Sequence, residues 1–229
     1  MKNTKAFFIY DNLLGLPLFQ GMNRSDIEEV VAHVKFGFER YSTNKVVVRE
    51  GMSCHVLYFL LKGRLTVCTS SADHSYSFEE ELSAPDMLQP ECLFGLTQRY
   101  TRTFVTQGRC DFFTIDKQAV MRLTDEYTIF RLNLMNAVTT RAQRLSARLW
   151  HPAPTDTRQR IVRFIETHCF RPVGAKTIRM TVECLALQIN ANCQEVSAAL
   201  KQFASDGLIE KKRGMIIVPA LQNLSQACK

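Results

Sequence analysis

The chain has 229 residues, of which 46% are hydrophobic, so it is long enough to bury one large core or two modest ones. Its net charge is +7, and a basic balance of this size favours a polyanionic partner such as a nucleic acid. No apolar run reaches the roughly 18 residues that a membrane helix requires, and the N-terminal sequence does not resemble a secretion signal. We therefore expect a cytoplasmic protein without a membrane partner.

The N-terminal half predicts a short helix followed by an antiparallel β-roll. A capping sequence beginning at Asn23 precedes apolar residues at helical spacing, which predicts an amphipathic helix within residues 16–35. Segments rich in β-branched and aromatic residues then predict strands, with glycine or proline as punctuation. These segments are Asn44–Glu50, Val56–Thr69, Ser75–Leu82 and Thr101–Asp116. We expect a jelly-roll-like sensory domain over residues 1–116.

The pattern becomes helical at Lys117 and continues so to Trp150, where a His-Pro-Ala-Pro sequence predicts a domain boundary. Apolar residues in this helix repeat at 3-4-3-4 spacing, which is the spacing of a seam that two copies of a helix share. They are Met135, Val138, Ala142, Leu145 and Leu149. Because two heptads are few, periodicity alone leaves open whether this stripe contacts a second copy or the roll.

The remaining residues, 151–229, predict a winged helix-turn-helix. Asp156 can cap a first helix together with Gln159, and Thr181 can cap a second short helix that ends at Asn190. Asn192 stands three residues before Glu195 and predicts a capping box at the head of a helix over Cys193–Ser205. The inward face of that helix is apolar and comprises Val196, Ala199, Leu200 and Phe203.

The outward face of the same helix suits a DNA major groove. Glutamine can pair with adenine, alanine can touch a thymine methyl group, and lysine can reach phosphate. After this helix, Leu208-Ile209 and Met215–Val218 predict two strands around a basic turn, which is typical of a wing, and Lys176–Thr181 predicts a third strand beside it. The predicted contacts to double-stranded DNA are Asn192, Cys193, Gln194, Ser197, Ala198, Lys201, Lys211, Lys212 and Arg213.

The cysteines and hydroxyl residues predict neither a metal site nor catalysis. Eight cysteines are scattered singly without a Cys-x-x-Cys pair, which predicts reduced thiols and no zinc or iron–sulfur cofactor. The chain contains no Gly-x-Ser-x-Gly sequence and no recognised cysteine nucleophile signature, so we expect no enzyme. Cys193 opens the predicted recognition helix, and redox sensing there stands as an alternative to an inert thiol.

With this order of elements the chain resembles the Crp/Fnr family of bacterial transcription regulators. The resemblance is carried by the Gly51–Gly63 segment of the roll, by residues 156–161 and by Leu185–Ile209. It implies an α+β fold, a homodimer formed through the long helix of residues 117–150, and a palindromic operator. It also implies RNA polymerase as a partner and an effector bound within the roll.

Departures from the family concern the effector and the operator. In cyclic-nucleotide-binding members a Gly-Glu pair opens a phosphate cassette that ends in Arg-Ser-Ala, and the residues here that match it best are Glu91, Arg102 and Thr103. However, Pro90 removes a backbone donor and Phe104 is bulky where the family has a small residue, so we expect a degenerate pocket, in which Arg102 simply pairs with Glu91.

Other ligands and functions are weighed on the same residues. The Fnr-like iron–sulfur type has a cysteine cluster near its N-terminus, and no cysteine precedes Cys54 here, so we expect no such cluster. We interpret His33, His55 and His74 as surface or packing residues, so we expect no haem ligand. Cys193, Gln194 and Ala198 replace the Arg, Glu and Arg of the family's best-known reader, which favours an operator richer in A·T pairs. Two alternatives remain: a cyclic-nucleotide-responsive regulator, and a protein-interaction adaptor whose helix-turn-helix, with Lys201 as its only recognition-helix cation, is vestigial.

Overall fold

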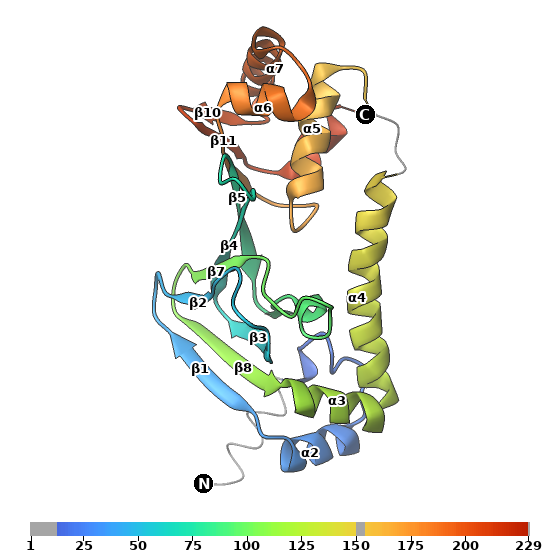
Figure 1. Cartoon of the computed structure of the whole chain (residues 1–229). Coiled ribbons are helices and arrows are strands. Elements are labelled where there is room, and N and C mark those ends of the chain that lie inside the picture. The colour runs from blue at the N-terminus through green and yellow to red at the C-terminus, as the bar shows by residue number, and fades with distance from the viewer. Residues whose placement is uncertain (1–12, 150–153, 229) are drawn as a thin grey trace. The chain divides into compact units, whose positions relative to one another are not determined.

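The computed structural model describes residues 13–149 and 154–228, which form two compact units (Figure 1). Unit 1 contains the described residues up to Leu65 together with Leu82–Ala147. Unit 2 contains Thr66–Glu81 together with the described residues from Arg148 onward. The β-rich part, the long helix and the helix-turn-helix follow one another along the chain, which confirms the predicted α+β fold. Of the predicted His-Pro-Ala-Pro boundary, only Pro154 lies within the described residues.

The roll of unit 1 consists of antiparallel strands with the order β1-β8-β3-β6, beside which β2 pairs with β7. Gly63 forms the tight turn after β3, at a φ of +105°. A Cβ atom there would lie 2.7 Å from the carbonyl oxygen of Arg109, so no larger residue fits this turn. The strands are β1 (Gly37–Tyr41), β2 (Val46–Val48), β3 (Val56–Lys62), β6 (Asp86–Met87), β7 (Thr103–Thr106) and β8 (Cys110–Asp116).

The strand predictions for this half are right in place but incomplete. Glycine breaks divide two of the predicted segments, as β3 with β4 (Arg64–Ser70) and β7 with β8 show, and β2 is shorter than its segment. The sequence pattern does not predict β1 or β6. β1 alternates half-buried and exposed residues, and a long-range contact anchors it: Arg40 Nε donates to Asp111 of β8 at 2.6 Å.

One of the two helix predictions for unit 1 is corrected by the structure. α2 (Arg24–His33) begins at the predicted Asn23 cap, but the helix expected over residues 117–150 is two helices, α3 (Lys117–Glu126) and α4 (Thr128–Leu149). The break falls at Tyr127, whose backbone is extended at ψ 106° while its N–H still closes α3 on Leu123. The redirected chain lets Phe130 of α4 pack edge-on against Phe19, with ring centroids 5.2 Å apart.

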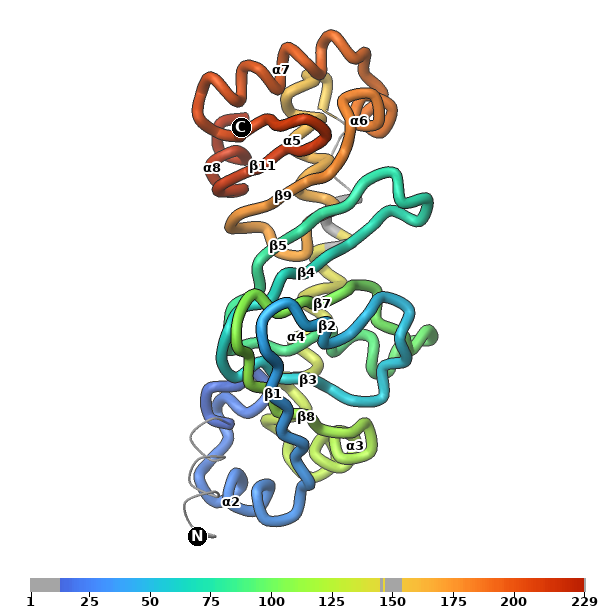
Figure 2. Tube along the Cα trace, turned by 90° about the vertical axis from the view of Figure 1, so that its left-hand side faces the viewer, coloured from blue at the N-terminus to red at the C-terminus, as the bar shows by residue number. Residues whose placement is uncertain are grey.

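Unit 2 combines the helix-turn-helix with a sheet of the order β10-β11-β9-β5, in which β9 lies between β11 and β5 (Figure 2). Its elements are α5 (Thr157–His168), β9 (Lys176–Arg179), α6 (Val182–Ile189), α7 (Cys193–Ser205), β10 (Glu210–Lys212), β11 (Met215–Val218), α8 (Leu221–Gln226) and the outer part of β5 (Ser77–Ser83). β9 pairs with β11, as predicted. The first wing strand is not Leu208-Ile209 but β10, because Ile209 turns into the core and leaves the polar Glu210–Lys212 to pair with β11.

The prediction for Ser75–Leu82 is also corrected. We expected this strand to belong to the N-terminal roll alone. The structure instead pairs Ser77–Glu80 of β5 with β9, and the core of unit 2 includes Phe78. The reason is complementarity across the two strands: Phe78 lies opposite Ile178, and Glu80 lies opposite Lys176.

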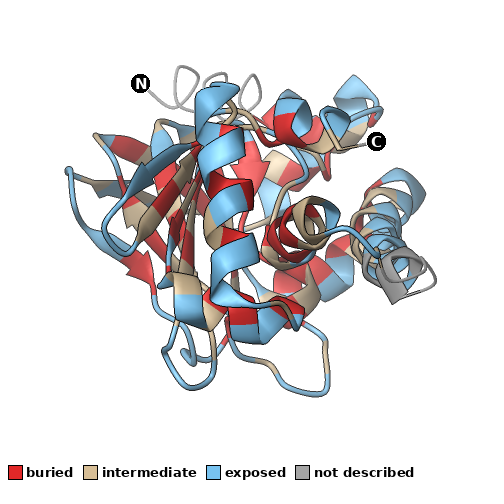
Figure 3. Cartoon of the chain, turned by 90° about the horizontal axis from the view of Figure 1, so that it is seen from above, coloured by how far each residue is buried: buried red, intermediate tan, exposed pale blue. Residues whose placement is uncertain are grey.

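Colouring by burial shows helices with one buried stripe and exposed outer faces (Figure 3).

Candidate nucleic-acid interface

Local capping interactions fix the helix-turn-helix of unit 2. The Thr181 hydroxyl accepts from the Cys184 amide at 3.1 Å and opens α6, which ends at Asn190 in the left-handed conformation, with a φ of +52°. The Asn192 side chain then accepts from the Glu195 amide and donates to the Glu195 carboxylate, both at 2.8 Å. This second contact is a capping-box variant, and it sets the direction in which α7 leaves the turn.

The two faces of α7 differ as the spacing predicts. Its apolar side chains, Val196, Ala199, Leu200 and Phe203, are buried in the core of unit 2. Of the predicted contact residues on this helix, Cys193, Gln194, Ala198 and Lys201 are exposed, whereas Ser197 is half-buried. The exposed set therefore offers an amide, a methyl group and an ammonium group along one helix face, which are the groups that read base edges and phosphates.

The wing carries its cations on the surface. Lys211, Lys212 and Arg213 are all exposed, the two lysines within β10 and the arginine in the turn closed by Gly214. Lys212 Nζ lies 3.9 Å from the Glu210 carboxylate, and both side chains are more than half exposed, so solvent screens this pair. These cations are available to a polyanion approaching the wing.

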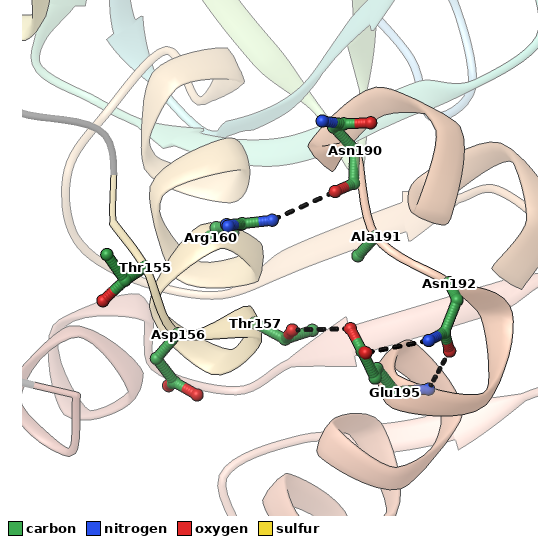
Figure 4. A pocket seen from close by; sticks show the side chains of 8 residues that line it. All are labelled: Thr155, Asp156, Thr157, Arg160, Asn190, Ala191, Asn192 and Glu195. Carbon is green, nitrogen blue, oxygen red and sulfur yellow. Dashed lines mark hydrogen bonds between the residues drawn. The ribbon is translucent and has the colours of Figure 1, made fainter.

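A polar groove lies beside the turn of the helix-turn-helix (Figure 4). It has a volume of about 650 Å³. Arg160 of α5 points across it and donates to the carbonyl oxygens of Asn190 at 3.0 Å and Pro154 at 2.9 Å. Thr157 donates to Glu195 at 3.2 Å, so the start of α5 is bonded to the start of α7. The lining residues are Thr155, Asp156, Thr157, Arg160, Asn190, Ala191, Asn192 and Glu195.

Sequence reasoning found the caps of this groove but missed Thr157 and Arg160. The only available signal was that these residues stand three apart on α5 and so share a helix face. The groove contains the carboxylates of Asp156 and Glu195, and both are hydrogen-bonded. Asp156 caps α5 by accepting from the Gln159 amide at 3.3 Å, whereas Glu195 accepts from the Asn192 side chain at 2.8 Å and from the Thr157 hydroxyl at 3.2 Å. At α6, the backbone amide and the Thr181 hydroxyl lower the pKa of Glu183, and Lys211 contributes to this shift.

The roll segment of residues 89–103, called the cassette segment here, holds the residues matched to a phosphate cassette. The Glu91 carboxylate, which we expected to pair with Arg102, forms an ion pair with Arg141 of α4. Thr103 accepts from the Glu50 amide at 3.1 Å. The helical spacing of α4 places Arg141 on the face that carries the buried Phe130 and Leu134.

Gln89 closes the cassette segment on itself. Its side chain is fully buried, its backbone is left-handed with a φ of +40°, and its Nε2 donates to the Thr101 hydroxyl at 2.6 Å. The Thr101 amide in turn donates to Gln89 Oε1 at 3.1 Å. The following residue, Pro90, is the first of a short 3₁₀ helix and has no N–H, while Phe104 is fully buried. Internal contacts therefore occupy polar groups at both ends of the segment.

Comparison with protein families matches both parts of the chain. Residues 38–127 match the cyclic nucleotide-binding domain, and residues 159–227 match the Crp-like helix-turn-helix domain. The chain belongs to the Crp/Fnr family. It is accordingly a DNA-binding transcription regulator of a non-enzymatic family. A comparison with curated proteins finds no match.

Solved structures of bacterial regulators align with the chain at low sequence identity. The sensor domain of the transcriptional regulator DNR from Pseudomonas aeruginosa aligns with a TM-score of 0.52 and 18% identity, covering 66% of this chain and 98% of that one. The catabolite activator protein of Thermus thermophilus aligns over 93% of this chain and 100% of its own, at 13% identity and a TM-score of 0.49. The regulator CLP of Xanthomonas campestris aligns over 86% and 99%, at 18% identity and a TM-score of 0.48.

The long helix of this Crp/Fnr protein has one face against the roll and one face exposed. Phe130 and Leu134 are buried on the roll side. Of the predicted seam, Met135 and Ala142 are exposed and Val138 is half-buried, whereas the side chains of Leu145 and Leu149 lie outside the described part. Ile129 and Leu132 of the same helix are also exposed, and the seam prediction omits them.

The remaining chemistry of the described residues is sparse. Within residues 13–149 and 154–228, no three side chains of the His, Cys, Asp or Glu type gather where they could hold a metal ion. No helix among those residues is both long and apolar enough to cross a membrane. The histidines considered as haem ligands, His33, His55 and His74, are all exposed.

Proposed function

We propose that the protein is a cytoplasmic homodimer that binds a palindromic operator through α7 and the wing. The observation that carries this proposal is the exposed face of α7, with Gln194, Ala198 and Lys201, next to the three wing cations. Gln194 and Ala198 read base edges, and the wing holds the sugar–phosphate backbone. An operator richer in A·T than in G·C pairs follows, because the face offers an amide and a methyl group instead of a guanidinium.

Two copies account for the exposed apolar face of α4. Leu132, Met135 and Ala142 stand at spacings of three and seven, which places them on one side of the helix, and Leu132 and Met135 are each about half exposed. An isologous contact between two such helices covers this face in both copies and generates the twofold axis that a palindromic operator requires. RNA polymerase is the further partner that we propose for the bound dimer.

Selection of sequences from a random DNA pool tests this function. The purified full chain is expected to enrich an inverted repeat, with affinity for it falling steeply as salt rises from about 50 to 200 mM because phosphate contacts release counterions. A chain with Gln194→Ala and Lys212→Ala together is the matched control and is expected to lose the enrichment. Absence of any salt-dependent binding by the wild type would favour an adaptor whose helix-turn-helix is vestigial.

We further propose that the roll does not use cyclic AMP as its effector. Residues 38–127 match the cyclic nucleotide-binding domain, and this match does not identify a ligand. Within this part of the chain, the Glu91 carboxylate is ion-paired to Arg141, and Pro90 lacks the N–H that would bind a phosphate. Of the three residues matched to the cassette, Glu91, Arg102 and Thr103, Arg102 is the cation. One arginine–phosphate contact contributes about 1.5–3 kcal/mol, whereas a micromolar ligand needs about 8 kcal/mol.

Thermal unfolding and calorimetry with cyclic AMP test this second proposal. At about 1 mM nucleotide the expected melting temperature and operator affinity equal those without it, since a ligand that binds the native state raises stability. Binding tighter than about 10 μM that disappears in Arg102→Ala would instead establish a working cassette of Glu91, Arg102 and Thr103, and with it the cyclic-nucleotide-responsive alternative.

A further inference from the structure

We propose that Glu80 and Phe78 of β5 are positioning residues for the DNA-binding wing, an inference that rests on the function proposed above. Both residues belong to the outer part of the β4–β5 hairpin, residues 66–81, which is included in unit 2. That hairpin reaches the wing through a single intervening strand, β9, which pairs with β5 on one side and β11 on the other.

Two rows of buried side chains cross this sheet. Phe78 lies opposite Ile178, and Ile178 lies opposite Ile216, whose partner on the other side is Lys211 of the wing. The first three of these residues are no more than 4% exposed. The register thus connects the hairpin to a wing cation by one row of directly paired positions.

The second row contains a buried ion pair. Glu80 lies opposite Lys176, their charged atoms are 2.7 Å apart, and each side chain is 1% exposed. The Glu80 carboxylate also accepts from the amides of Phe170 and Arg171, and Lys176 Nζ donates to the Val173 carbonyl at 2.9 Å. Lys176 lies opposite Val218, the last residue of β11. The network therefore holds this end of β11, the strand that pairs with β10 in the wing.

An aromatic cluster holds the same hairpin against α5. The His168 ring stacks on Phe78 at a centroid distance of 5.6 Å and an interplanar angle of 13°. Its Nδ1 donates to the Phe164 carbonyl at 2.7 Å, which leaves Nε2 to accept from the Tyr76 hydroxyl at 3.1 Å. Backbone pairing, apolar packing and the hydrogen-bonded Glu80 carboxylate therefore hold the hairpin to the rest of unit 2.

Loss of the Glu80 charge leaves Lys176 buried without its counter-ion, and an unpaired buried charge is strongly unfavourable. The least costly relief is separation of β9 from β5, after which β11 and the wing cations lose their fixed position. The effect on DNA binding is then confined to the contacts made by the wing. Contacts made by α7, whose caps and core do not include the hairpin ion pair, are unchanged.

Double-mutant cycles in the full chain, on the selected operator, test this assignment. Glu80→Gln is expected to weaken binding about tenfold and to reduce the slope of log affinity against log salt by about 2, as wing phosphate contacts are lost. In this background Lys212→Ala is expected to have little further effect, whereas Gln194→Ala keeps its full effect. Hydrogen exchange is expected to rise at residues 176–179 and 215–218.

Glu79→Gln is the matched control, since Glu79 is the neighbouring residue of the same strand and pairs with Arg179 in a half-exposed contact at 2.8 Å. It is expected to bind DNA as the wild type does. The double variant Glu80→Gln/Lys176→Met removes both charges, and we expect it to recover affinity to within about threefold of the wild type, because no unpaired charge is left.

A folded Glu80→Gln chain with wild-type hydrogen exchange and an undiminished effect of Lys212→Ala would overturn the inference. Should Glu80→Gln not fold, Phe78→Leu replaces it with a smaller change at the other row, and the same selective loss of the Lys212 effect is required of it. A wild type that fails to bind DNA contradicts the proposed function instead, so the two failures are distinguishable.

Discussion

Single side chains of α7 divide between reading bases and holding the backbone. Lys201 is the one cation among the exposed residues of this helix, so most phosphate contact is left to the wing. Gln194 stands within the first turn, next to the Asn192 cap that fixes the direction of the helix. An amide at such a position specifies sequence, whereas an ammonium group on the wing contributes affinity without specificity.

Gln194→Ala is expected to reduce affinity for the selected operator by about 1–3 kcal/mol, because one bidentate base contact is lost. The preference at that base position is expected to disappear. Lys212→Ala should instead weaken binding to all sequences alike and reduce the salt slope by about 1. Titrations with operator variants at several salt concentrations measure both effects, and an unchanged base preference in Gln194→Ala contradicts the docking of α7.

The thiols of Cys193 and Cys92 are expected to differ in reactivity. Burial raises the pKa of Cys92 to about 11, helped by the nearby Glu91 charge, and its side chain is 5% exposed. Since only the thiolate reacts, Cys92 stays unreactive until the pH approaches that value. Cys193 is exposed. Iodoacetamide at about pH 8 should therefore modify Cys193 first in the folded protein, with equal rates in urea as the control. Equal rates without urea contradict the burial argument.

At the scale of elements, caps and faces could be predicted because they depend on residues three or four positions apart. Asn192 with Glu195 and Thr181 with the Cys184 amide are contacts of this kind. The break at Tyr127 could not be predicted, because the packing of Phe130 against Phe19 decides it over more than a hundred residues. The same reason applies to Glu91, whose partner Arg141 is 50 residues away.

Asn190, at the end of α6, allows a test of the turn itself. Its φ of +52° is costly for a residue with a Cβ and no local hydrogen bond, and glycine adopts it freely. Asn190→Gly is expected to change the free energy of unfolding by less than about 0.5 kcal/mol, and Asn190→Ala to lower it by about 1 kcal/mol more. Urea unfolding of both variants measures the difference. Equal stabilities would show that the left-handed backbone carries no cost.

At the scale of the whole molecule, the pairing of β5 with β9 lay beyond prediction for a further reason. The alternation in Ser75–Leu82 predicts a strand but does not name its partner, and Glu80 alone reads as a surface residue. Its burial is compensated by the oppositely charged Lys176, 96 residues away, and by the backbone amides of Phe170 and Arg171. Partner choice in a sheet thus depends on complementarity between distant segments, which composition and periodicity do not contain.

The proposed assembly of two copies through α4 is a property of the whole molecule. Met135→Asp places a charge in the proposed α4 seam, where Met135 is 54% exposed in the single chain. Burying that charge in a dimer without a partner is unfavourable enough to separate the copies. We expect the variant to sediment as a monomer at micromolar concentration and to bind a half-site only, so its affinity for the full inverted repeat falls towards that for one half. Thr140→Asp is the matched control, because Thr140 is exposed on another side of the same helix, and this variant should remain dimeric. A wild-type chain that sediments as a monomer at the same concentration contradicts the seam, whichever operator it selects.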